Sequence, residues 1–187
     1  MAIRNEKPIP GFDGYFAADD GTITKPCGKN TRGSLNRSTG YYQLQIEYMK
    51  YTVHRLVASA WVKNPRPDLY TMCDHIDENG WNNRPQNLRW VSNGLNARNS
   101  THRYGVHFHK EVGMWRVQIY DANSVSQHLG YFKTFLEGYR VAKPFKEQVF
   151  KEIYERETQH YVPITFIVRR QEVVIVQQPV RRTFFGL

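Results

Sequence analysis

The chain has 187 residues, of which 40% are hydrophobic, so it is long enough and apolar enough to build a globular core. Lysine and arginine total 26 against 17 acidic residues, and the resulting net charge of +9 is spread along the whole chain. A disordered basic arm would concentrate that excess in one segment, whereas a protein that lies along a polyanion carries it over much of its length. The charge therefore favours nucleic acid as a partner over a merely basic soluble protein.

Cysteine content and the N-terminus bear on the compartment. The two cysteines, Cys27 and Cys73, form neither a CxxC pair nor a disulfide framework, which argues for a reducing compartment and against a cysteine-based zinc site. The first residues, MAIRNEKPIPG, lack the apolar run of a secretory signal, and no apolar stretch reaches the roughly 18 residues that a membrane span needs. We expect a cytoplasmic protein with no membrane partner.

Residues 8–50 are rich in glycine and aromatic residues and predict a small antiparallel sheet. Glycines separate short apolar pieces in PIPGFDGYFAADDGTITK, and Tyr42, Leu44 and Ile46 then alternate with the period of a half-buried strand. From Val53 to Val62 the apolar spacing becomes helical, and Asn64-Pro65 ends that helix. A second short helix is expected near residues 92–99, with Ser92 as its N-cap.

Residues 104–132 predict strands that are followed by a helix. In MWRVQIY, Trp115, Val117 and Ile119 should face a core, while the alternate residues face away from it. Thr134 can cap a helix that begins at Phe135, and Pro144 should kink or split this helix because it lacks a backbone donor. The β-branched tail around residues 163–180 suits either a hairpin or an oligomer contact.

The stretch TMCDHIDENGWNNRPQNLRW, residues 71–90, places Asp74 and His75 side by side at the end of an apolar run. Asp74 supplies a carboxylate and Asn96, on the second helix, an amide oxygen; a hard divalent cation prefers such ligands. Adjacent strand residues point to opposite faces, so His75 does not share that metal and can act as a general base toward water. The alternative is that each polar residue merely serves a turn or a cap.

Asn87 closes a polar loop of eleven residues, 76–86, after His75. Backbone groups in such a loop need partners, and a side-chain amide that both donates and accepts can bridge the two sides. We therefore expect Asn87 to brace the loop.

At these residues the chain resembles the HNH, or ββα-metal, nucleases of the phage and intron-encoded homing branch. The resemblance covers residues 53–99 and rests on VHRLVASAWVKNP, DHIDENGWNN, PQNLRWVS and Asn96. It implies that His75 is the general base, that Asn87 is the central asparagine, and that Asp74 and Asn96 hold one Mg²⁺ or Mn²⁺ per active site. The last position is Asn rather than the His of many HNH proteins, as is frequent in the homing branch.

The flanking segments resemble DNA-binding modules. PGFDGYFAADDGTITK is similar to a nuclease-associated module. RYGVHFHKEVGMWRVQIYD (103–121) followed by HLGYFKTFLEG (128–138) is similar to the APETALA-type, ethylene-response DNA-binding domain. That family carries arginines on its exposed strands, whereas this chain has a more varied set there. The predicted DNA-contacting residues are Arg55, Arg89, Arg98, His107, His109, Arg116, Gln118 and Tyr120.

Together, the residues and the resemblance imply an α+β protein with a small N-terminal antiparallel sheet, a central ββα-metal unit, and a three-stranded antiparallel sheet packed on a helix. The predicted domains are an N-terminal module (1–52), the HNH nuclease (53–100), the APETALA-type domain (101–158) and a strand-rich tail (159–187).

The function implied is a metal-dependent, site-specific endonuclease that nicks double-stranded DNA, without a small-molecule cofactor. We expect it to act as a monomer expressed from a phage or mobile element, with a dimer through the tail left open. The alternatives are a DNA-binding protein that keeps the HNH fold without catalysis, and an RNA-binding or assembly module that uses the tail.

Overall fold

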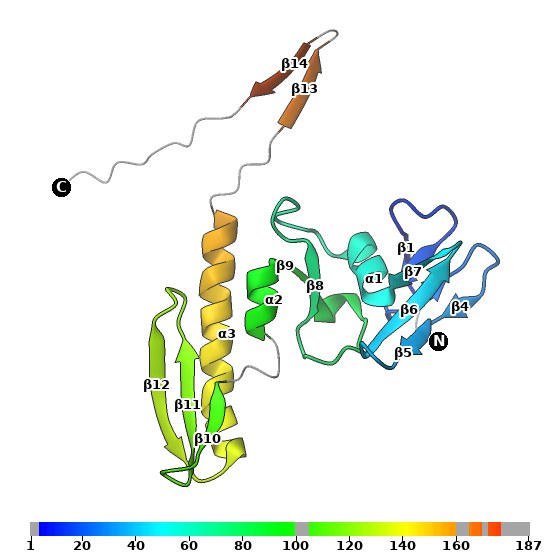
Figure 1. Ribbon diagram of the computed structural model, residues 1–187. Coiled ribbons are helices and arrows are strands. Elements are labelled where there is room, and N and C mark those ends of the chain that lie inside the picture. Colours follow the sequence, from blue (N-terminus) through cyan, green and yellow to red (C-terminus); the bar gives the residue numbers. More distant parts are fainter. Residues whose placement is uncertain (1–3, 100–104, 160–164, 170–171, 177–187) are drawn as a thin grey trace.

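The computed structural model describes residues 4–99, 105–159, 165–169 and 172–176. It is an α+β structure in which short helices and one long helix accompany several small antiparallel sheets (Figure 1). The predicted fold class is confirmed.

The N-terminal segment, residues 4–52, contains two small sheets rather than one. The first sheet consists of β1 (Glu6–Pro8), β2 (Phe16–Ala18), β3 (Ile23–Thr24) and β4 (Asn30–Thr31), in that order. The second consists of β5 (Ser34–Asn36), β6 (Tyr41–Ile46) and β7 (Met49–Thr52). The predicted alternation in β6 is present, because Leu44 and Ile46 are buried and Tyr42 packs against the same core.

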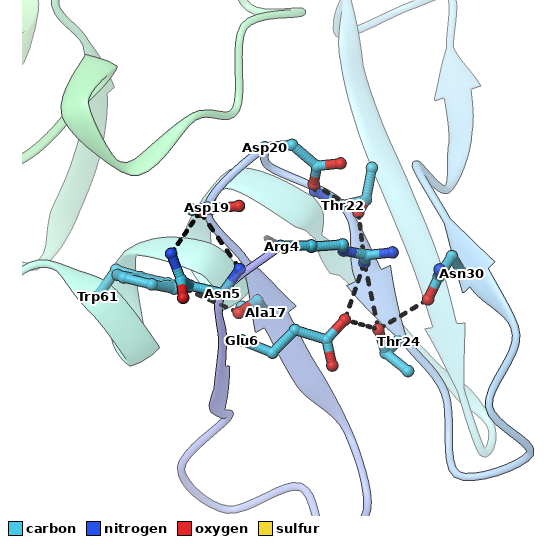
Figure 2. Close-up of polar contacts among 10 residues, drawn as sticks. All are labelled: Arg4, Asn5, Glu6, Ala17, Asp19, Asp20, Thr22, Thr24, Asn30 and Trp61. Carbon is cyan, nitrogen blue, oxygen red and sulfur yellow. Dashed lines mark hydrogen bonds and ion pairs between the residues drawn. The ribbon is translucent and has the colours of Figure 1, made fainter. Parts of the chain in front are cut away.

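Polar side chains tie the first sheet together and to helix α1 (Val53–Trp61). Arg4 donates to the hydroxyls of Thr22 and Thr24, at 2.7 and 3.2 Å, and forms an ion pair with Glu6 (Figure 2). The indole nitrogen of Trp61 donates to the carbonyl of Ala17 at 2.8 Å. These contacts hold the end of α1 against the sheet.

Helix α1 lies at the centre of a core that joins the N-terminal module to the following segment. Its residues Val53, Leu56 and Val57 are buried with apolar side chains of both N-terminal sheets. The same cluster includes Cys73 and Leu88, which belong to the next pair of strands. The segments 4–52 and 53–99 therefore share one hydrophobic core.

The ββα unit follows α1. Strands β8 (Met72–His75) and β9 (Leu88–Val91) pair antiparallel, with the 3₁₀ helix η1 (Pro85–Asn87) just before β9. Helix α2 (Asn93–Asn99) comes next, and the backbone N–H of Leu95 donates to the hydroxyl of Ser92. Ser92 is thus the N-cap that the sequence predicts.

The next sheet consists of β10 (Val106–His109), β11 (Met114–Tyr120) and β12 (Ser126–Phe132), and α3 (Phe135–Gln159) packs against it. Val117 and Ile119 are buried beneath α3 and Trp115 packs beside them, so the predicted core face is confirmed. Thr134 accepts a hydrogen bond from the N–H of Glu137, whose carboxylate accepts from the N–H of Thr134 in return. This reciprocal pair is a capping box at the start of α3.

Of the kink or split predicted at Pro144, the split is absent, because α3 is continuous from Phe135 to Gln159. Its first half packs on the sheet through Ala142, and its second half packs on the ββα unit through Val149 and Ile153. A proline inside a helix costs about 3 kcal/mol, and apolar burial on both sides of Pro144 offsets that cost. In Figure 1, α3 lies between the sheet and α2.

The tail forms a hairpin, one of the two structures that the sequence allows. Strands β13 (Thr165–Arg169) and β14 (Glu172–Val176) pair antiparallel with each other. Within the part of the chain that the structure describes, no helix is both long and apolar enough to cross a membrane.

Candidate active site

The β8–β9 hairpin presents Asp74 and His75 on opposite faces. In the ladder, Asp74 lies opposite Arg89 and His75 opposite Leu88. Burial alternates along β8, with Cys73 and His75 buried and Met72 and Asp74 less so. Helix α1 contacts the hairpin, and α2 contacts β8. The separation of Asp74 from His75 therefore follows directly from the pleat of the strand.

One nitrogen of the His75 ring is held in place. The ring is only 4% exposed, and its Nε2 lies 3.0 Å from Oδ1 of Asn83. An amide oxygen can only accept, so Nε2 carries the proton in this pair. The neutral ring then has its lone pair on Nδ1, which is the atom suited to accept a proton.

Two further rings surround His75, and the sequence analysis singled out neither. Tyr41 from β6 stacks on His75 with ring centroids 5.8 Å apart and an angle of 9° between the planes. His54 from α1 meets His75 edge-on at 5.0 Å. Burial lowers the pKa of His54 to about 3, with smaller contributions from His75 and Arg55, so His54 is uncharged at neutral pH.

Asn87 bridges the loop between β8 and β9. Its Oδ1 accepts from the backbone N–H of Asp77, and its Nδ2 donates to the Asp77 carboxylate and to the carbonyl of Asn82. Burial alone would raise the pKa of Asp77, but hydrogen bonds from Asn82, Asn79 and Asn87 lower it below its usual value. The loop is therefore held by side-chain amides across its width.

Asp74 forms an ion pair that links it to α3. Arg89 donates from Nε and Nη2 to Oδ2 of Asp74, at 2.9 and 2.8 Å. The same guanidinium lies 3.6 Å from the ring centroid of Phe150 on α3. Arg89 was predicted to contact DNA, and in the structure it is partly buried between these two partners.

A small cleft of about 110 Å³ lies beside this ion pair, between the loop and α3. Lys146 of α3 faces the carboxylates of Glu78 and Asp74 there. Burial lowers the pKa of Lys146, and those two carboxylates oppose that shift. The lining residues are Ile76, Glu78, Arg89, Lys143, Lys146, Glu147 and Phe150.

The oxygen donors of Asp74 and Asn96 suit Mg²⁺ or Mn²⁺ better than a soft metal. Asn96 is half-buried on α2, the helix that contacts β8. Among the described residues, no group of three or more His, Cys, Asp or Glu side chains could hold a metal ion. Such a donor set fits an open magnesium site completed by water and phosphate oxygens, and does not fit a closed zinc site.

Apart from Arg89 and Arg98, the residues predicted to contact DNA fall into two regions. Arg55 is exposed on α1, with its guanidinium 6.0 Å from the Trp90 ring. The other region is the β10–β11 face, where Tyr120 is 59% exposed and Arg116 Nε is buried without a hydrogen-bond partner among the described residues. His107 is exposed and His109 half-buried there.

Four predicted DNA-contacting residues line one cavity between α2, the sheet and α3. The cavity has a volume of about 430 Å³, and these residues are Arg98, His107, Gln118 and Tyr120. Arg98 also donates to the carbonyl of Asp121 and to the hydroxyl of Ser124, which ties α2 to the sheet. Lys146 of α3 lines the same cavity.

The residues that the sequence analysis missed carry weak local signals. Tyr41 lies on the polar face of a correctly predicted strand, where a single aromatic residue is common on a protein surface and indicates no function. His54 occupies a helix whose apolar pattern concealed a buried polar side chain. Asn83 belongs to the DENGWNN stretch, where turn chemistry explains an asparagine equally well.

Comparisons with known proteins point to one class. No protein-family model matches the chain. The uncharacterized HNH endonuclease L247 of Acanthamoeba polyphaga mimivirus is 30% identical over 103 residues, which are 52% of this chain and 26% of the relative. The uncharacterized HNH endonuclease L245 of the same virus is 30% identical over 121 residues, which are 56% of this chain and 36% of the relative. The chain thus spans well under half of each relative's length.

Among solved structures, one that describes DNA binding and cleavage by the HNH homing endonuclease I-HmuI aligns with 66% of this chain and 76% of its own. The identity is 24% and the TM-score 0.45. Because that TM-score is low, the inference of function depends on the sequence relatives and on the geometry of the site.

Proposed function

We propose that the protein is a metal-dependent DNA endonuclease of the HNH type, which hydrolyses one phosphodiester bond at a specific site. The observation that carries this proposal is that a hydrogen bond with Asn83 fixes the ring of His75. Asn83 binds Nε2 of His75, the residue that follows Asp74 in strand β8, on a hairpin that α2 contacts. The names of the two mimivirus relatives support the same class.

In this proposal each polar residue has a separate role. His75 accepts a proton from the attacking water at Nδ1, a role typically worth about 10²–10⁴ in rate. Asp74 and Asn96 hold one Mg²⁺ or Mn²⁺. When bound, that ion would polarise the scissile phosphate and neutralise charge on the leaving oxygen. Asn87 keeps the loop in shape, so that Asn83 stays in reach of His75.

We further propose that the sheet of β10, β11 and β12 contacts the DNA. Its packing on α3 is the arrangement that the APETALA-type resemblance implies. Arg116 and Gln118 lie on the side of β11 away from that core, and both residue types can form bidentate contacts with base edges. Arg55, His107, His109 and Tyr120 would add contacts. Arg89 and Arg98 donate to protein groups, and the exposed Gln118 amide donates to the hydroxyl of Ser126, a bond that it would exchange for a base.

The mimivirus relatives favour a viral or mobile genetic origin for the chain. The competing function is a DNA-binding protein that keeps the fold without cleaving. DNA binding alone does not require a buried histidine held by one amide beside a carboxylate, so the site favours the nuclease.

A cleavage assay tests this proposal. Purified protein is incubated with a pool of supercoiled plasmids that carry random inserts, either with Mg²⁺ or with EDTA. We expect nicked circles with Mg²⁺ and none with EDTA. If the protein retains the plasmids in a gel-shift assay but leaves them intact at every Mg²⁺ and Mn²⁺ concentration, the non-catalytic alternative is correct.

A further inference from the structure

Tyr41 forms one wall of the packing around His75, although it belongs to the N-terminal module, residues 4–52. Its ring lies nearly parallel to the His75 ring and also contacts His54, with a centroid distance of 4.9 Å. On the loop after β8, a Cβ at Gly80 would lie 3.0 Å from the Tyr41 ring, so the loop backbone packs closely against Tyr41. Removing the Tyr41 ring would therefore remove packing contacts with both His75 and the loop.

His54 forms the second wall and is buried with no hydrogen-bond partner for Nδ1 among the described residues. Because its pKa is about 3, this ring is neutral and places no positive charge beside His75. His75 therefore contacts a neutral ring on one side, a tyrosine face on another, and an amide oxygen at Nε2.

The N-terminal module also touches Asn83, the residue that binds His75. Gly21 has a φ of +84°, and a Cβ at this position would lie 2.6 Å from the carbonyl carbon and 2.7 Å from the carbonyl oxygen of Asn83. Only glycine permits both that φ and that approach. The turn between β2 and β3 is thus in direct contact with the backbone of Asn83.

We propose that the N-terminal module completes the active site by positioning the general base, with Tyr41 fixing the plane of the His75 ring and Gly21 fixing the place of Asn83. The proposal rests on the nuclease function, because it takes His75 as the base. Tyr41 and Gly21 are positioning residues in this account. A misplacement of about 1 Å in a reacting group can cost about 100-fold in rate, so loose positioning should reduce turnover.

The first test compares Tyr41→Leu with Tyr41→Phe. Tyr41→Phe keeps the ring and should cleave within about twofold of the wild type. Tyr41→Leu should lower kcat by about 10- to 100-fold with an unchanged KM for DNA. Tyr48→Leu removes a tyrosine that is 97% exposed and serves as the control for losing an aromatic residue from the same module. Equal kcat values for Tyr41→Leu and the wild type would overturn the proposal.

The second test distinguishes a clash of a new Cβ with the Asn83 backbone from the strain of placing alanine at a positive φ. Gly21→Ala and Gly28→Ala both place alanine at a positive φ, +84° and +76°, but a Cβ at Gly28 meets nothing within 4 Å. Gly21→Ala should therefore lose about 10-fold or more in kcat relative to Gly28→Ala. Equal losses of kcat in the two variants would show that Gly21 does not position Asn83.

A readout that needs no cleavage keeps this proposal distinct from the proposed function. In protein labelled with ¹⁵N-histidine, NMR should show the neutral His75 protonated at Nε2 in the wild type and in Tyr41→Phe. In Tyr41→Leu and Gly21→Ala we expect that signal to broaden or to show both tautomers. A signal that is unchanged in both variants overturns the positioning role, even where His75→Ala abolishes cleavage. Conversely, a wild type that shows the predicted spectra but never cleaves DNA overturns the nuclease function alone.

Discussion

His54 is a buried histidine, and its burial makes the stability of the fold depend on pH. Its pKa is about 3 in the folded chain against 6.5 in an exposed histidine. As the pH falls below about 6.5, the unfolded chain binds a proton that the folded chain does not, so stability is lost between pH 6.5 and about 3. Each pH unit in that window lowers the free energy of unfolding by about 1.4 kcal/mol.

His54→Phe should remove this part of the acid sensitivity while keeping an aromatic ring in place. Urea unfolding of the wild type and the variant, at several values between pH 7 and pH 4.5, measures the difference. The wild type should lose more stability than the variant as the pH falls. Parallel curves would show that His54 is not a buried neutral group.

The proposed metal ligands predict a loss of metal dependence without a loss of fold. Asp74→Asn keeps the shape of the carboxylate next to Arg89 but removes its charge, and Asn96→Ala removes the amide on α2. Both variants should lose Mg²⁺-dependent cleavage and bind Mn²⁺ more weakly in calorimetry, with melting temperatures near that of the wild type. Glu111→Gln changes an exposed acid away from the site and is the control. Normal cleavage by either variant would exclude that residue as a ligand.

Along strand β11, residues that we propose to contact DNA alternate with residues that pack on the core. Arg116→Ala and Gln118→Ala should each lower the preference for target over random DNA, because a lost base contact costs about 1–3 kcal/mol. Trp115→Ala should instead destabilise the sheet, since Trp115 packs with the buried core beneath α3. Competition binding and thermal melting distinguish the two effects. An unchanged preference in both Arg116→Ala and Gln118→Ala would mean that another surface reads the sequence.

Local patterns predicted the elements well where local chemistry determines them. The Ser92 and Thr134 caps, the alternation in β11 and the α1 periodicity each depend on residues within one or two turns of chain. The continuity of α3 through Pro144 could not be read this way, because it depends on apolar contacts with two distant segments. The surroundings of His75 escaped prediction for the same reason, since Tyr41 and His54 come from other elements.

In the molecule as a whole, α3 joins the ββα unit to the sheet of β10, β11 and β12. It packs on the β10–β12 sheet through Ala142 and on the ββα unit through Val149. The helix rises about 1.5 Å per residue, so this shared element holds the sheet and the hairpin at a set separation. We expect cleavage at a fixed distance from the bases that the sheet contacts.

One proposed general base, His75, and one proposed metal site per chain predict a nick in one strand. Cutting both strands would need a second site, supplied by a dimer or by rebinding in the opposite orientation. On a supercoiled plasmid with a single target site, nicked circles should accumulate first and persist. Linear product that appears without a nicked intermediate, from a protein with the mass of a dimer, would show paired cutting.

We propose that His75 acts in the chemical step rather than in binding. The decisive measurement is the single-turnover cleavage rate of His75→Ala beside its affinity for the same DNA, at constant salt and with folding checked by thermal melting. We expect the cleavage rate of His75→Ala to be about 10²–10⁴-fold lower than that of the wild type. Its affinity for DNA should be almost unchanged, because phosphate contacts dominate binding. A folded His75→Ala protein that cleaves at close to the wild-type rate would contradict the account.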